Sequence, residues 1–546
     1  MRRFIEQHSD KIYDLIVIGG GITGAAVAYD AASRGLSVAL IEKGDFGAAT
    51  SAATSKLIHG GLRYLATMEF GLVRESLRER KTLENIAPNF IYPVPFMITT
   101  NNAKLTNTRP VIKAGMILYD ILSWDKGMTR DPGKKIPLHR SIGPDEVMRL
   151  EPNVKREGLT GASIYYDCQS ICPERLTLAF INSAVKHGAD VSNYAQVTDF
   201  LRGIGGRIEG VKVKDLVRSG EKRIRATLTI NCGGPWADIL LGLAKKQKPG
   251  EQLRRSEGIH VITKKLVGEH VVGSMTPSGR HFFLIPWRGH SLIGTTDKEY
   301  VGRPDDYRVT KKSILELLSD VNGSFGNGNP ITYDDVLYCY GGLRPLVEDQ
   351  TEDVYESSRK YEIYDNSADG LDGLITVEGG KYTTSRNLAE NAMKVITAKL
   401  GKKTGKMITK DAFLAGCEIP DMESFMKKAL SDNEDFPAAS IDYLARIYGT
   451  GLGRVLELAR SRKKWAAPLN REGEMPAQVV YAVREEMALT LKDIIFRRTG
   501  LGTLGHPGKE VLKKITDTAA EELGWDAVKK KEEMQSAEKA LMIPKD

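Results

Sequence analysis

Apolar runs near the start of the chain predict two strands that flank a helix. Tyr13 to Ile18 (YDLIVI) is apolar without polar alternation, which is typical of a strand buried on both faces. Ile22 to Arg34 is rich in alanine and is followed by Gly35, which predicts a helix that ends at a glycine. Ser37 to Ile41 (SVALI) predicts a second buried strand. Together these elements predict a βαβ unit and therefore a parallel sheet.

Strand-like segments farther along the chain extend this pattern. Arg225 to Asn231 (RATLTIN) and Leu374 to Val377 are short apolar runs, and residues 191–217 contain alternating strands separated by glycine-rich turns. Residues 258–263 and 282–296 predict paired strands of a second unit. We therefore expect the first sheet to be assembled from segments that lie far apart in the sequence.

The pattern changes after about residue 405 to helices rich in charge. Ala477 to Arg498 and Lys509 to Lys531 each predict one helix. A chain of 546 residues is too long for a single hydrophobic core, so two or three domains are expected. The last of them is expected to be helical.

Composition and charge exclude some classes of function. The net charge of +8 favours anionic small molecules, anionic lipid surfaces or nucleic acid. No basic-aromatic array, zinc spacing or recognition-helix pattern is present, so we expect neither a nucleic-acid partner nor a bound metal. An odd number of scattered cysteines favours structural roles in a reducing, cytoplasmic compartment. The five are Cys168, Cys172, Cys232, Cys339 and Cys417.

A glycine motif joins the first predicted strand to the first helix. Residues 19–24 (GGGITG) fit G-x-G-x-x-G, in which Gly19 permits a tight turn, Gly21 lets a pyrophosphate approach, and Gly24 allows close packing of the helix. The phosphates would bind at the helix N-terminus. Glu42, at the end of the next strand, is placed to accept hydrogen bonds from ribose hydroxyls, which disfavours NADP. The motif alone allows FAD or NAD.

The following segment favours FAD. Residues 48–64 (AATSAATSKLIHGGLRY) are rich in small and hydroxyl side chains. Such a segment can follow an extended cofactor, with its backbone amides toward the pyrophosphate and the flavin edge. An ordinary Ser/Thr loop is the alternative interpretation.

Three glycine pairs are each followed by a cation. Residues 60–63 and 341–344 both read GGLR, and residues 379–381 read GGK. Paired glycines let the backbone pass against a flat ring, and the cation beyond can face a molecule that lies on that ring. Three cations around one substrate indicate an anion, since arginine matches phosphate or carboxylate oxygens. Solvated turn residues are the alternative.

Motifs along nearly the whole chain carry a resemblance to a known family. They are GGGITG (19–24), SKLIHGGLRYL (55–65), GASIYYD (161–167), NCGGPWAD (231–238), EGIH (257–260), IGTTD (293–297), GGLRPL (341–346), EGGKYTTSR (378–386) and REEMALTLKDIIFRRTGLG (484–502). In this order they resemble the FAD-dependent glycerol-3-phosphate dehydrogenase family, within the glucose-inhibited-division/amino-acid-oxidase-like class of flavoproteins. The resemblance implies bound FAD and oxidation of sn-glycerol 3-phosphate to dihydroxyacetone phosphate. The sequence gives no evident reason for a covalent link, so we expect the FAD to be non-covalent.

The resemblance also implies roles for individual residues. His260, Arg344 and Lys381 are expected to be catalytic, with His260 as the base that accepts the C2 hydroxyl proton while the C2 hydride passes to flavin N5. A merely packed histidine is the alternative for His260. The expected substrate-binding residues are Arg63, Tyr64, His260, Arg344, Arg359 and Lys381. The expected FAD-binding residues are Gly19, Gly21, Ile22, Thr23, Gly24, Glu42, Lys43, Thr50, Ser51, Thr54, Lys56, Leu57, His59, Gly60, Gly61, Val197, Gly233, Trp236, Gly380, Lys381, Tyr382 and Thr383.

These expectations define an α/β fold class. A Rossmann-like FAD-binding domain is assembled from discontinuous segments and is joined by a β-rich substrate domain and a helical C-terminal domain. The expected limits are 1–86, 159–249 and 336–404 for the FAD-binding domain, 87–158 and 250–335 for the substrate or cap domain, and 405–546 for the helical domain.

The electron acceptor implied by the resemblance is a membrane quinone. Residues 109–126 combine an apolar stripe with cations and Trp124, which is typical of an interfacial helix, and a helix covering a domain or dimer interface is the alternative. We expect a peripheral protein on the cytoplasmic face of the cell membrane, without a spanning helix, and a homodimer.

Two alternative functions remain open. One is a glycerol-3-phosphate oxidase that passes them to oxygen. Streptococcal-type oxidases carry an extra inserted segment, and the short region 325–335 shows no obvious insertion, so a dehydrogenase is favoured. The other is a non-catalytic FAD-binding redox sensor.

Overall fold

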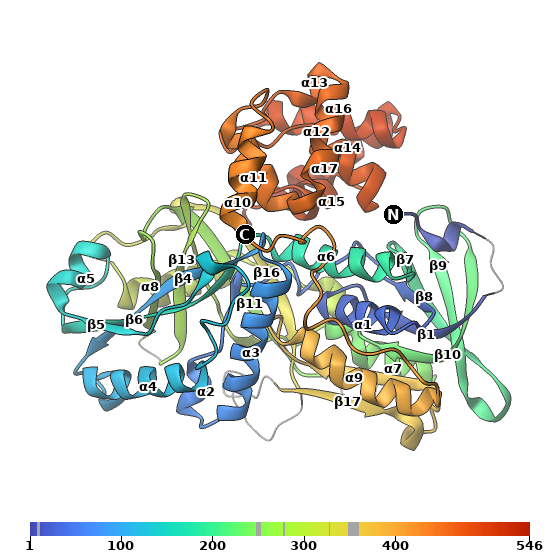
Figure 1. Cartoon of the computed structure of the whole chain (residues 1–546), viewed down its shortest axis with the longest axis horizontal. Helices are drawn as coiled ribbons and strands as arrows, with labels where there is room; N and C mark the ends of the chain where they lie inside the picture. The colour runs from blue at the N-terminus through green and yellow to red at the C-terminus, as the bar shows by residue number, and fades with distance from the viewer. Residues whose placement is uncertain (8–10, 247–252, 277–278, 327, 348–359, 546) are drawn as a thin grey trace.

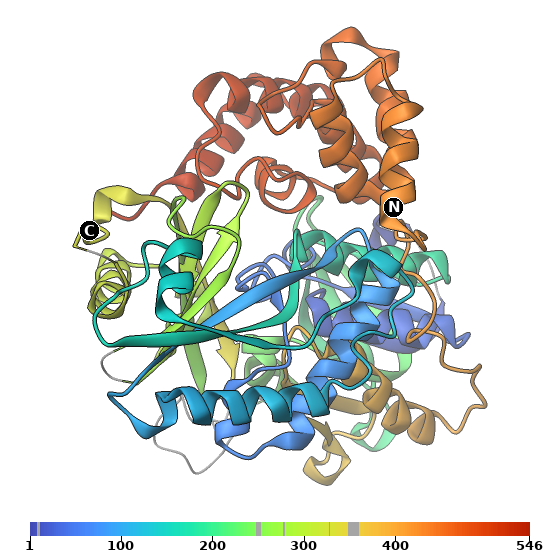
Figure 2. The same ribbon diagram turned by 60° about the vertical axis from the view of Figure 1, so that its left-hand side comes forward.

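The chain folds into two sheets that lie side by side, with a layer of C-terminal helices above them (Figure 1). The computed structural model describes residues 1–7, 11–246, 253–276, 279–326, 328–347 and 360–545. Figure 2 shows the same arrangement after rotation, with the C-terminal helices again outside the two sheets.

The first sheet is a mainly parallel sheet built from distant parts of the chain. In the described part of the chain it has eight strands, with the order β17-β18-β10-β1-β2-β7 and with β9 joining β8 to β10. The strands from β18 to β7 in this order run parallel. Their bounds are β1 (Ile12–Ile18), β2 (Val38–Ile41), β7 (Asp190–Ser192), β8 (Ala195–Arg202), β9 (Ile208–Asp215), β10 (Glu221–Asn231), β17 (Tyr361–Asp365) and β18 (Leu374–Gly379). This confirms the predicted discontinuous α/β sheet.

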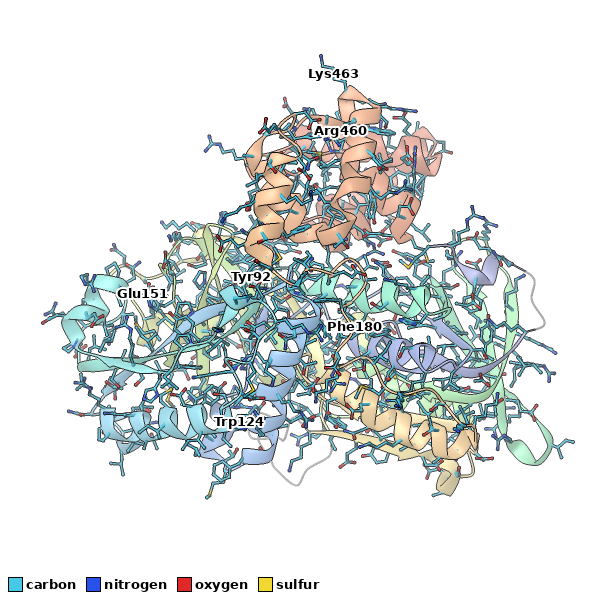
Figure 3. The ribbon with its side chains drawn as sticks, viewed as in Figure 1. Tyr92, Trp124, Glu151, Phe180, Arg460 and Lys463 are labelled. Carbon is cyan, nitrogen blue, oxygen red and sulfur yellow. The ribbon has the colours of Figure 1, made fainter. Side chains whose placement is uncertain are left out.

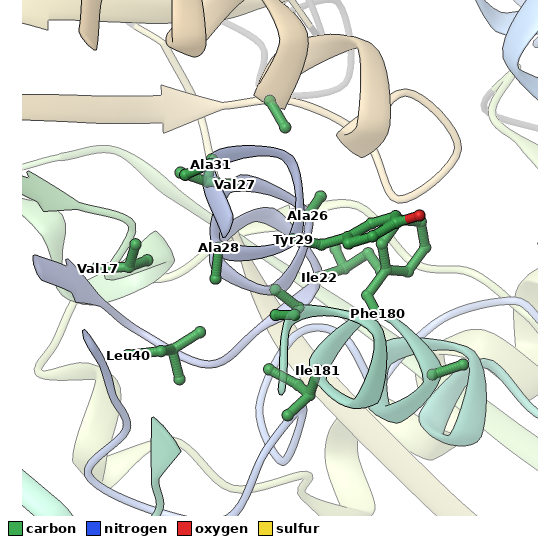
Figure 4. Close-up of a cluster of buried hydrophobic side chains, with 14 of the residues drawn as sticks. Val17, Ile22, Ala26, Val27, Ala28, Tyr29, Ala31, Leu40, Phe180 and Ile181 are labelled. Atoms are coloured by element: carbon green, nitrogen blue, oxygen red, sulfur yellow. The ribbon is translucent and has the colours of Figure 1, made fainter. Parts of the chain in front are cut away.

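Both faces of this sheet are covered, which explains why its strands are apolar throughout. Side chains alternate between faces along a strand, so Leu15 and Val17 lie in one core whereas Ile16 and Ile18 lie in another. The first core contains α1 (Ile22–Ser33), α6 (Pro173–Lys186) and α9 (Ser385–Leu400). The second contains β8, β9 and α7 (Ala237–Lys245). Figure 4 shows Val17 and Leu40 beside α1, with Tyr29 and Phe180 meeting between α1 and α6.

The second sheet is mostly antiparallel and corresponds to the predicted β-rich unit. Among the described residues it has ten strands, and β11 pairs with both β14 and β16. The strands are β3 (Leu57–Ile58), β4 (Ile91–Asn101), β5 (Arg140–Ile142), β6 (Leu159–Ser170), β11 (Arg255–Lys264), β12 (Val271–Met275), β13 (His281–Trp287), β14 (His290–Gly294), β15 (Lys298–Glu299) and β16 (Val336–Pro345). The accompanying helices are α2 (Arg63–Ala66), α3 (Phe70–Ile86), α4 (Arg109–Leu122), α5 (Pro144–Leu150) and α8 (Lys311–Ser324). The predicted domain limits remain a prediction. Within the segments expected for the FAD-binding domain, β6 and β16 belong to this second sheet, where β6 pairs with β4 and β16 pairs with β11.

The C-terminal layer is helical, although two predicted helices are broken. Its elements are α10 (Met422–Ser431), α11 (Ala438–Tyr448), α12 (Leu452–Ser461), α13 (Lys463–Ala466), α14 (Ala477–Glu486), α15 (Leu491–Asp493), the π-helical η10 (Ile494–Arg498), α16 (Lys509–Leu523) and α17 (Ala527–Leu541). The prediction of one helix over 477–498 was wrong because Met487 is left-handed (φ +57°) and Thr490 starts a new, capped turn. The prediction over 509–531 was wrong because left-handed Gly524 (φ +68°) ends α16.

Candidate active site

The glycine motif opens the N-terminus of α1 toward a large cavity. α1 begins at Ile22 after Gly21, which has no side chain to cap the helix, and the Ile22 N–H donates to Ser51 Oγ at 2.9 Å. Gly19 has φ +106°, and a Cβ there would lie 2.4 Å from the Cys232 carbonyl oxygen. A Cβ on Gly24 would lie 1.9 Å from the Gly19 carbonyl oxygen. Only glycine fits these close approaches, and the positive end of the helix dipole therefore reaches the cavity.

Glu42 follows β2 directly and lines the same cavity. The Gly20 N–H donates to Oε2 and the Gly44 N–H donates to Oε1, both at 2.7 Å. Burial raises the pKa of Glu42. The two N–H groups fix the carboxylate where the sequence predicts a ribose contact, and each oxygen keeps a further lone pair for a hydroxyl donor.

One cavity of about 2730 Å³ connects the glycine motif with the second sheet. Pockets for drug-sized ligands measure about 300–1,000 Å³, so this cavity has room for an extended dinucleotide and a second small molecule. The helix N-terminus, the glycine cradle and Glu42 fit FAD. The predicted residues that line the cavity are Gly19, Gly21, Ile22, Thr23, Glu42, Lys43, Thr50, Ser51, Thr54, Leu57, His59, Gly61, Arg63, Tyr64, Val197, Gly233, Trp236, His260, Arg344, Gly380, Lys381, Tyr382 and Thr383.

The four other predicted site residues are Gly24, Gly60, Arg359 and Lys56, and the three of them that the structure describes do not line this cavity. Gly24 packs on the backbone of the motif itself. Gly60 donates its N–H to the Tyr119 hydroxyl at 3.1 Å, so it anchors the loop from behind. Arg359 lies outside the described residues. The fourth is Lys56.

Lys56 points into the protein instead of into the cavity. Its side chain is 3% exposed, and its ammonium forms an ion pair with the buried Glu174. The ammonium also lies 5.2 Å from the centre of the Tyr340 ring. The side chain of Lys56 therefore places a buried positive charge behind the cavity wall, and its predicted contact with the cofactor stays a prediction.

Two of the three predicted cations meet at the ring of Tyr64. Lys381 Nζ lies 4.1 Å and Arg63 Cζ lies 5.1 Å from the ring centre. Lys381 Nζ also donates to Ser76 Oγ at 3.1 Å. Burial is the main cause of the lowered pKa of His59, and both cations lower it further. This part of the cavity is electropositive and suits an anion.

The third cation, Arg344, lies on β16 beside β11. Its Nη2 donates to Thr295 Oγ1 at 2.7 Å, and its Nη1 donates to the Thr296 carbonyl oxygen at 3.2 Å. The Asp297 carboxylate lies 3.5 Å from Nη1. The guanidinium has space because residue 258 is glycine, where a Cβ would lie 2.0 Å from Nη2. Since the side chain is still 25% exposed, Arg344 is oriented and accessible to a ligand.

His260 lies on β11 within reach of the same cavity. Its Nε2 is hydrogen bonded to Ser55 Oγ at 2.8 Å, and its ring stacks on Tyr340 with centroids 5.0 Å apart. Burial, followed by the positive charges of Arg344 and Lys56, holds the pKa of His260 well below its usual value. The imidazole is therefore neutral near pH 7, as a proton acceptor must be.

The glycine pairs also pack closely on protein atoms, and their passage along a flat ring stays a prediction. A Cβ on Gly61 would lie 2.5 Å from Tyr64 Cδ2, and a Cβ on Gly342 would lie 2.7 Å from Ala53 Cβ. The close neighbours of these glycines are thus protein atoms. Glycine is required so that the loops pack on one another around the cavity, with the following cation directed along its wall.

Sequence reasoning missed a contact that spans the cavity. Lys43 Nζ lies 2.6 Å from Asp305 Oδ1, and Trp236 Nε1 donates to the same oxygen at 3.0 Å. Lys43 Nζ also lies 3.9 Å from the centre of the Trp236 ring. Asp305 comes after β15 of the second sheet, whereas Lys43 and Trp236 come after β2 and β10 of the first sheet. No sequence pattern signals the contact.

The cysteines provide no second reactive centre. All five are buried and free of disulfides. Burial raises the pKa of Cys172 to about 12 and that of Cys168 well above its usual value, so both thiols stay protonated. Within the ranges that the structure describes, no group of three or more His, Cys, Asp or Glu side chains could hold a metal ion.

Comparison with known families identifies the class. The family described as FAD dependent oxidoreductase matches residues 14–386, and the C-terminal domain of alpha-glycerophosphate oxidase matches residues 407–530. Together with the fold and the glycine cradle on the cavity, these matches define the chain as an FAD-dependent oxidoreductase.

Individual relatives narrow the class to a family. A glycerol-3-phosphate dehydrogenase from Synechocystis sp. is 35% identical over 96% of this chain and 95% of its own length. An alpha-glycerophosphate oxidase from Streptococcus pyogenes is 31% identical over 91% of this chain and 89% of its own. The structure of glycerol-3-phosphate dehydrogenase from Bacillus halodurans complexed with FAD has a TM-score of 0.78 at 27% identity and covers 98% of this chain and 95% of that one. The chain belongs to the FAD-dependent glycerol-3-phosphate dehydrogenase family.

Proposed function

We propose that this protein oxidises sn-glycerol 3-phosphate to dihydroxyacetone phosphate with non-covalently bound FAD. The observation that carries the proposal is a single cavity that runs from the glycine motif at α1 to His260 and three cations, Arg63, Arg344 and Lys381. The names of the relatives, which include both dehydrogenases and oxidases of this substrate, support the same reaction.

The protein's own residues bind the substrate and handle its proton. Arg344 binds the phosphate, since its oriented guanidinium can form two charged hydrogen bonds, each contributing about 1.5–3 kcal/mol. The C2 hydroxyl is then held toward His260, whose neutral imidazole accepts the proton. Lys381 and Arg63 stabilise negative charge that develops on the side of the substrate away from Arg344. Bound FAD supplies the hydride acceptor.

The test is turnover by the purified holoenzyme with an artificial electron acceptor. Sn-glycerol 3-phosphate should be consumed with formation of dihydroxyacetone phosphate, and glycerol should react at least a hundredfold less efficiently because it lacks the phosphate. Equal kcat/KM values for glycerol and glycerol 3-phosphate would contradict phosphate recognition, and no turnover of either would contradict the reaction.

For the electron acceptor we propose a membrane quinone. The relatives include dehydrogenases and oxidases at similar identity, so the acceptor rests on the absence of an obvious insertion in the sequence near residues 325–335. Reduction of a soluble quinone analogue should exceed hydrogen peroxide formation in air. A peroxide yield equal to the substrate consumed, with no reduction of the quinone, would favour the oxidase.

We further propose that the α4 surface attaches the protein to the cytoplasmic face of the membrane. In the described ranges, no helix is both long and apolar enough to span a bilayer. Ile117, Ile121 and Trp124 repeat at helical spacing and are 46%, 61% and 67% exposed. Figure 3 labels Trp124, which follows the C-terminal end of α4. The exposed Arg109 and Lys113 on the same helix suit anionic headgroups. Co-sedimentation with anionic vesicles should be lost in Ile121→Asp, whereas sedimentation of that variant with the vesicles would contradict the proposal.

We also propose an oligomeric state and a division into domains. The protein is a homodimer, which analytical ultracentrifugation of the holoenzyme tests directly. We propose the three domain limits expected from the sequence, in which the segments of the FAD-binding domain also supply β6 and β16 to the second sheet. Limited proteolysis that leaves 405–546 as a separate fragment would support the last boundary.

A further inference from the structure

The imidazole of His260 is enclosed on nearly every side. The residue is only 1% exposed. One face stacks on Tyr340 at an angle of 18°. The Cδ2 edge lies against Gly294, where a Cβ would come within 2.4 Å of it. Nδ1 is buried and has no hydrogen-bond partner among the described residues. Although His260 lines the cavity, its Nδ1 is buried and its Nε2 is already hydrogen bonded to Ser55.

Ser55 occupies the position between this ring and the cavity. Its Oγ is hydrogen bonded to His260 Nε2 at 2.8 Å, and Ser55 itself is half-buried and lines the cavity. The backbone on both sides of Ser55 is held in place. The Thr54 carbonyl oxygen accepts a hydrogen bond from the Tyr340 hydroxyl at 2.8 Å, and Lys56 is fixed by its buried ion pair.

We propose that Ser55 relays the C2 hydroxyl proton of the substrate to His260, an inference that rests on the proposed oxidation of glycerol 3-phosphate. The substrate O–H bond breaks as its proton binds Ser55 Oγ, and the original Ser55 proton moves to His260 Nε2. Ser55 thus remains a neutral hydroxyl, and His260 becomes a cation. The electron pair left on the substrate oxygen forms the C=O bond as the C2–H bond breaks and its hydride leaves to the bound FAD, which is the oxidant.

The neutral state of His260 is consistent with this relay. For Nε2 to accept the proton, the resting imidazole must carry its own proton on Nδ1, and the Ser55 hydroxyl must donate to Nε2. Burial and the neighbouring positive charges favour the neutral ring until the proton arrives. The same surroundings make the proton easy to release afterward, so the base is regenerated in each turnover.

The test compares anaerobic single-turnover reduction of the holoenzyme by glycerol 3-phosphate in wild type, Ser55→Ala and Ser55→Thr. Ser55→Ala should slow the reduction by about a hundredfold, as expected for loss of a proton-transfer group. The substrate concentration at half-maximal rate should change by less than about threefold if the relay acts only in the proton transfer. Ser55→Thr, which keeps the hydroxyl, should regain most of the lost rate.

A proton inventory separates the relay from a merely structural role of Ser55. The rate of flavin reduction is plotted against the fraction of D₂O in H₂O/D₂O mixtures. The wild-type plot should be curved because two protons move together, whereas the Ser55→Ala plot should be a straight line. A linear wild-type inventory, or a Ser55→Ala rate within threefold of wild type, overturns the relay. Should Ser55→Ala lose FAD, the wild-type inventory alone decides. Absence of any reduction in wild type would instead refute the proposed function itself.

Discussion

Asp45 connects the loop after Glu42 to the C-terminal helices through buried ion pairs with Arg497 and Arg498. Asp45 is 2% exposed. Both of its oxygens accept hydrogen bonds from Arg498 at 2.8 Å, and Oδ2 also accepts one from Arg497 at 2.6 Å. Asn193 Nδ2 donates to Oδ1 at 3.1 Å. Although burial opposes ionisation, the two arginines hold the pKa of Asp45 well below its usual value.

Asp45→Asn removes the charge but keeps the shape of the side chain. The substitution leaves two buried guanidinium groups without their shared carboxylate, and breaking a buried pair in this way costs about 3–5 kcal/mol. Arg497 retains Asp493, and Arg498 retains the Glu486 carbonyl oxygen, so a loss near the lower limit is expected. Because residues 42–44 and 47–51, on both sides of Asp45, line the cavity, FAD affinity should fall as well.

Urea unfolding of the holoenzyme, together with FAD titration, measures both effects. Arg498→Gln combined with Asp45→Asn should cost less than the sum of the two single changes, because the double variant leaves fewer unpaired buried charges. Glu423→Gln in the exposed Lys427–Glu423 pair is the control and should not change stability measurably. A loss below about 1 kcal/mol for Asp45→Asn, or strict additivity with Arg498→Gln, would refute the reasoning.

Two further predictions address the cavity. Arg344→Ala should raise KM for glycerol 3-phosphate by about 10- to 100-fold, since it removes charged hydrogen bonds worth about 1.5–3 kcal/mol each, whereas His260→Ala should mainly lower kcat. Normal steady-state kinetics in both variants would contradict these roles. Asp305→Asn should speed FAD release roughly threefold to tenfold, because it weakens an exposed ion pair with Lys43 and the hydrogen bond from the Trp236 indole. Asp306→Asn is the control and should release FAD at the wild-type rate. Equal release rates in all three proteins would contradict a role for the contact.

Local patterns in the sequence predicted the framework of the fold. Unbroken apolar runs predict β1, β2 and β18 because both faces of the first sheet are covered. The helical period could not predict the breaks in the C-terminal layer, since a single left-handed residue such as Met487 does not alter the amphipathic pattern. Hydrophobic pattern therefore predicts the presence of an element more reliably than its ends.

The sequence predicted the parts of the candidate site that belong to local motifs. The cavity gathers most of the residues expected from the glycine motif and the three glycine–cation segments. The sequence could not show that Lys56 turns inward, because its partner Glu174 lies 118 positions away. The Ser55–His260 hydrogen bond joins residues 205 positions apart, and they meet although β3, which follows Ser55, and β11 are not neighbouring strands of the second sheet. Contacts of this kind follow from tertiary packing and leave no local signal.

Anaerobic titration of the FAD-loaded protein with sn-glycerol 3-phosphate tests the central claim most directly. The yellow flavin absorbance should bleach stoichiometrically with the phosphorylated substrate and stay unchanged with glycerol. A flavin band that persists in excess glycerol 3-phosphate would contradict the assignment of this cavity to oxidation of that substrate.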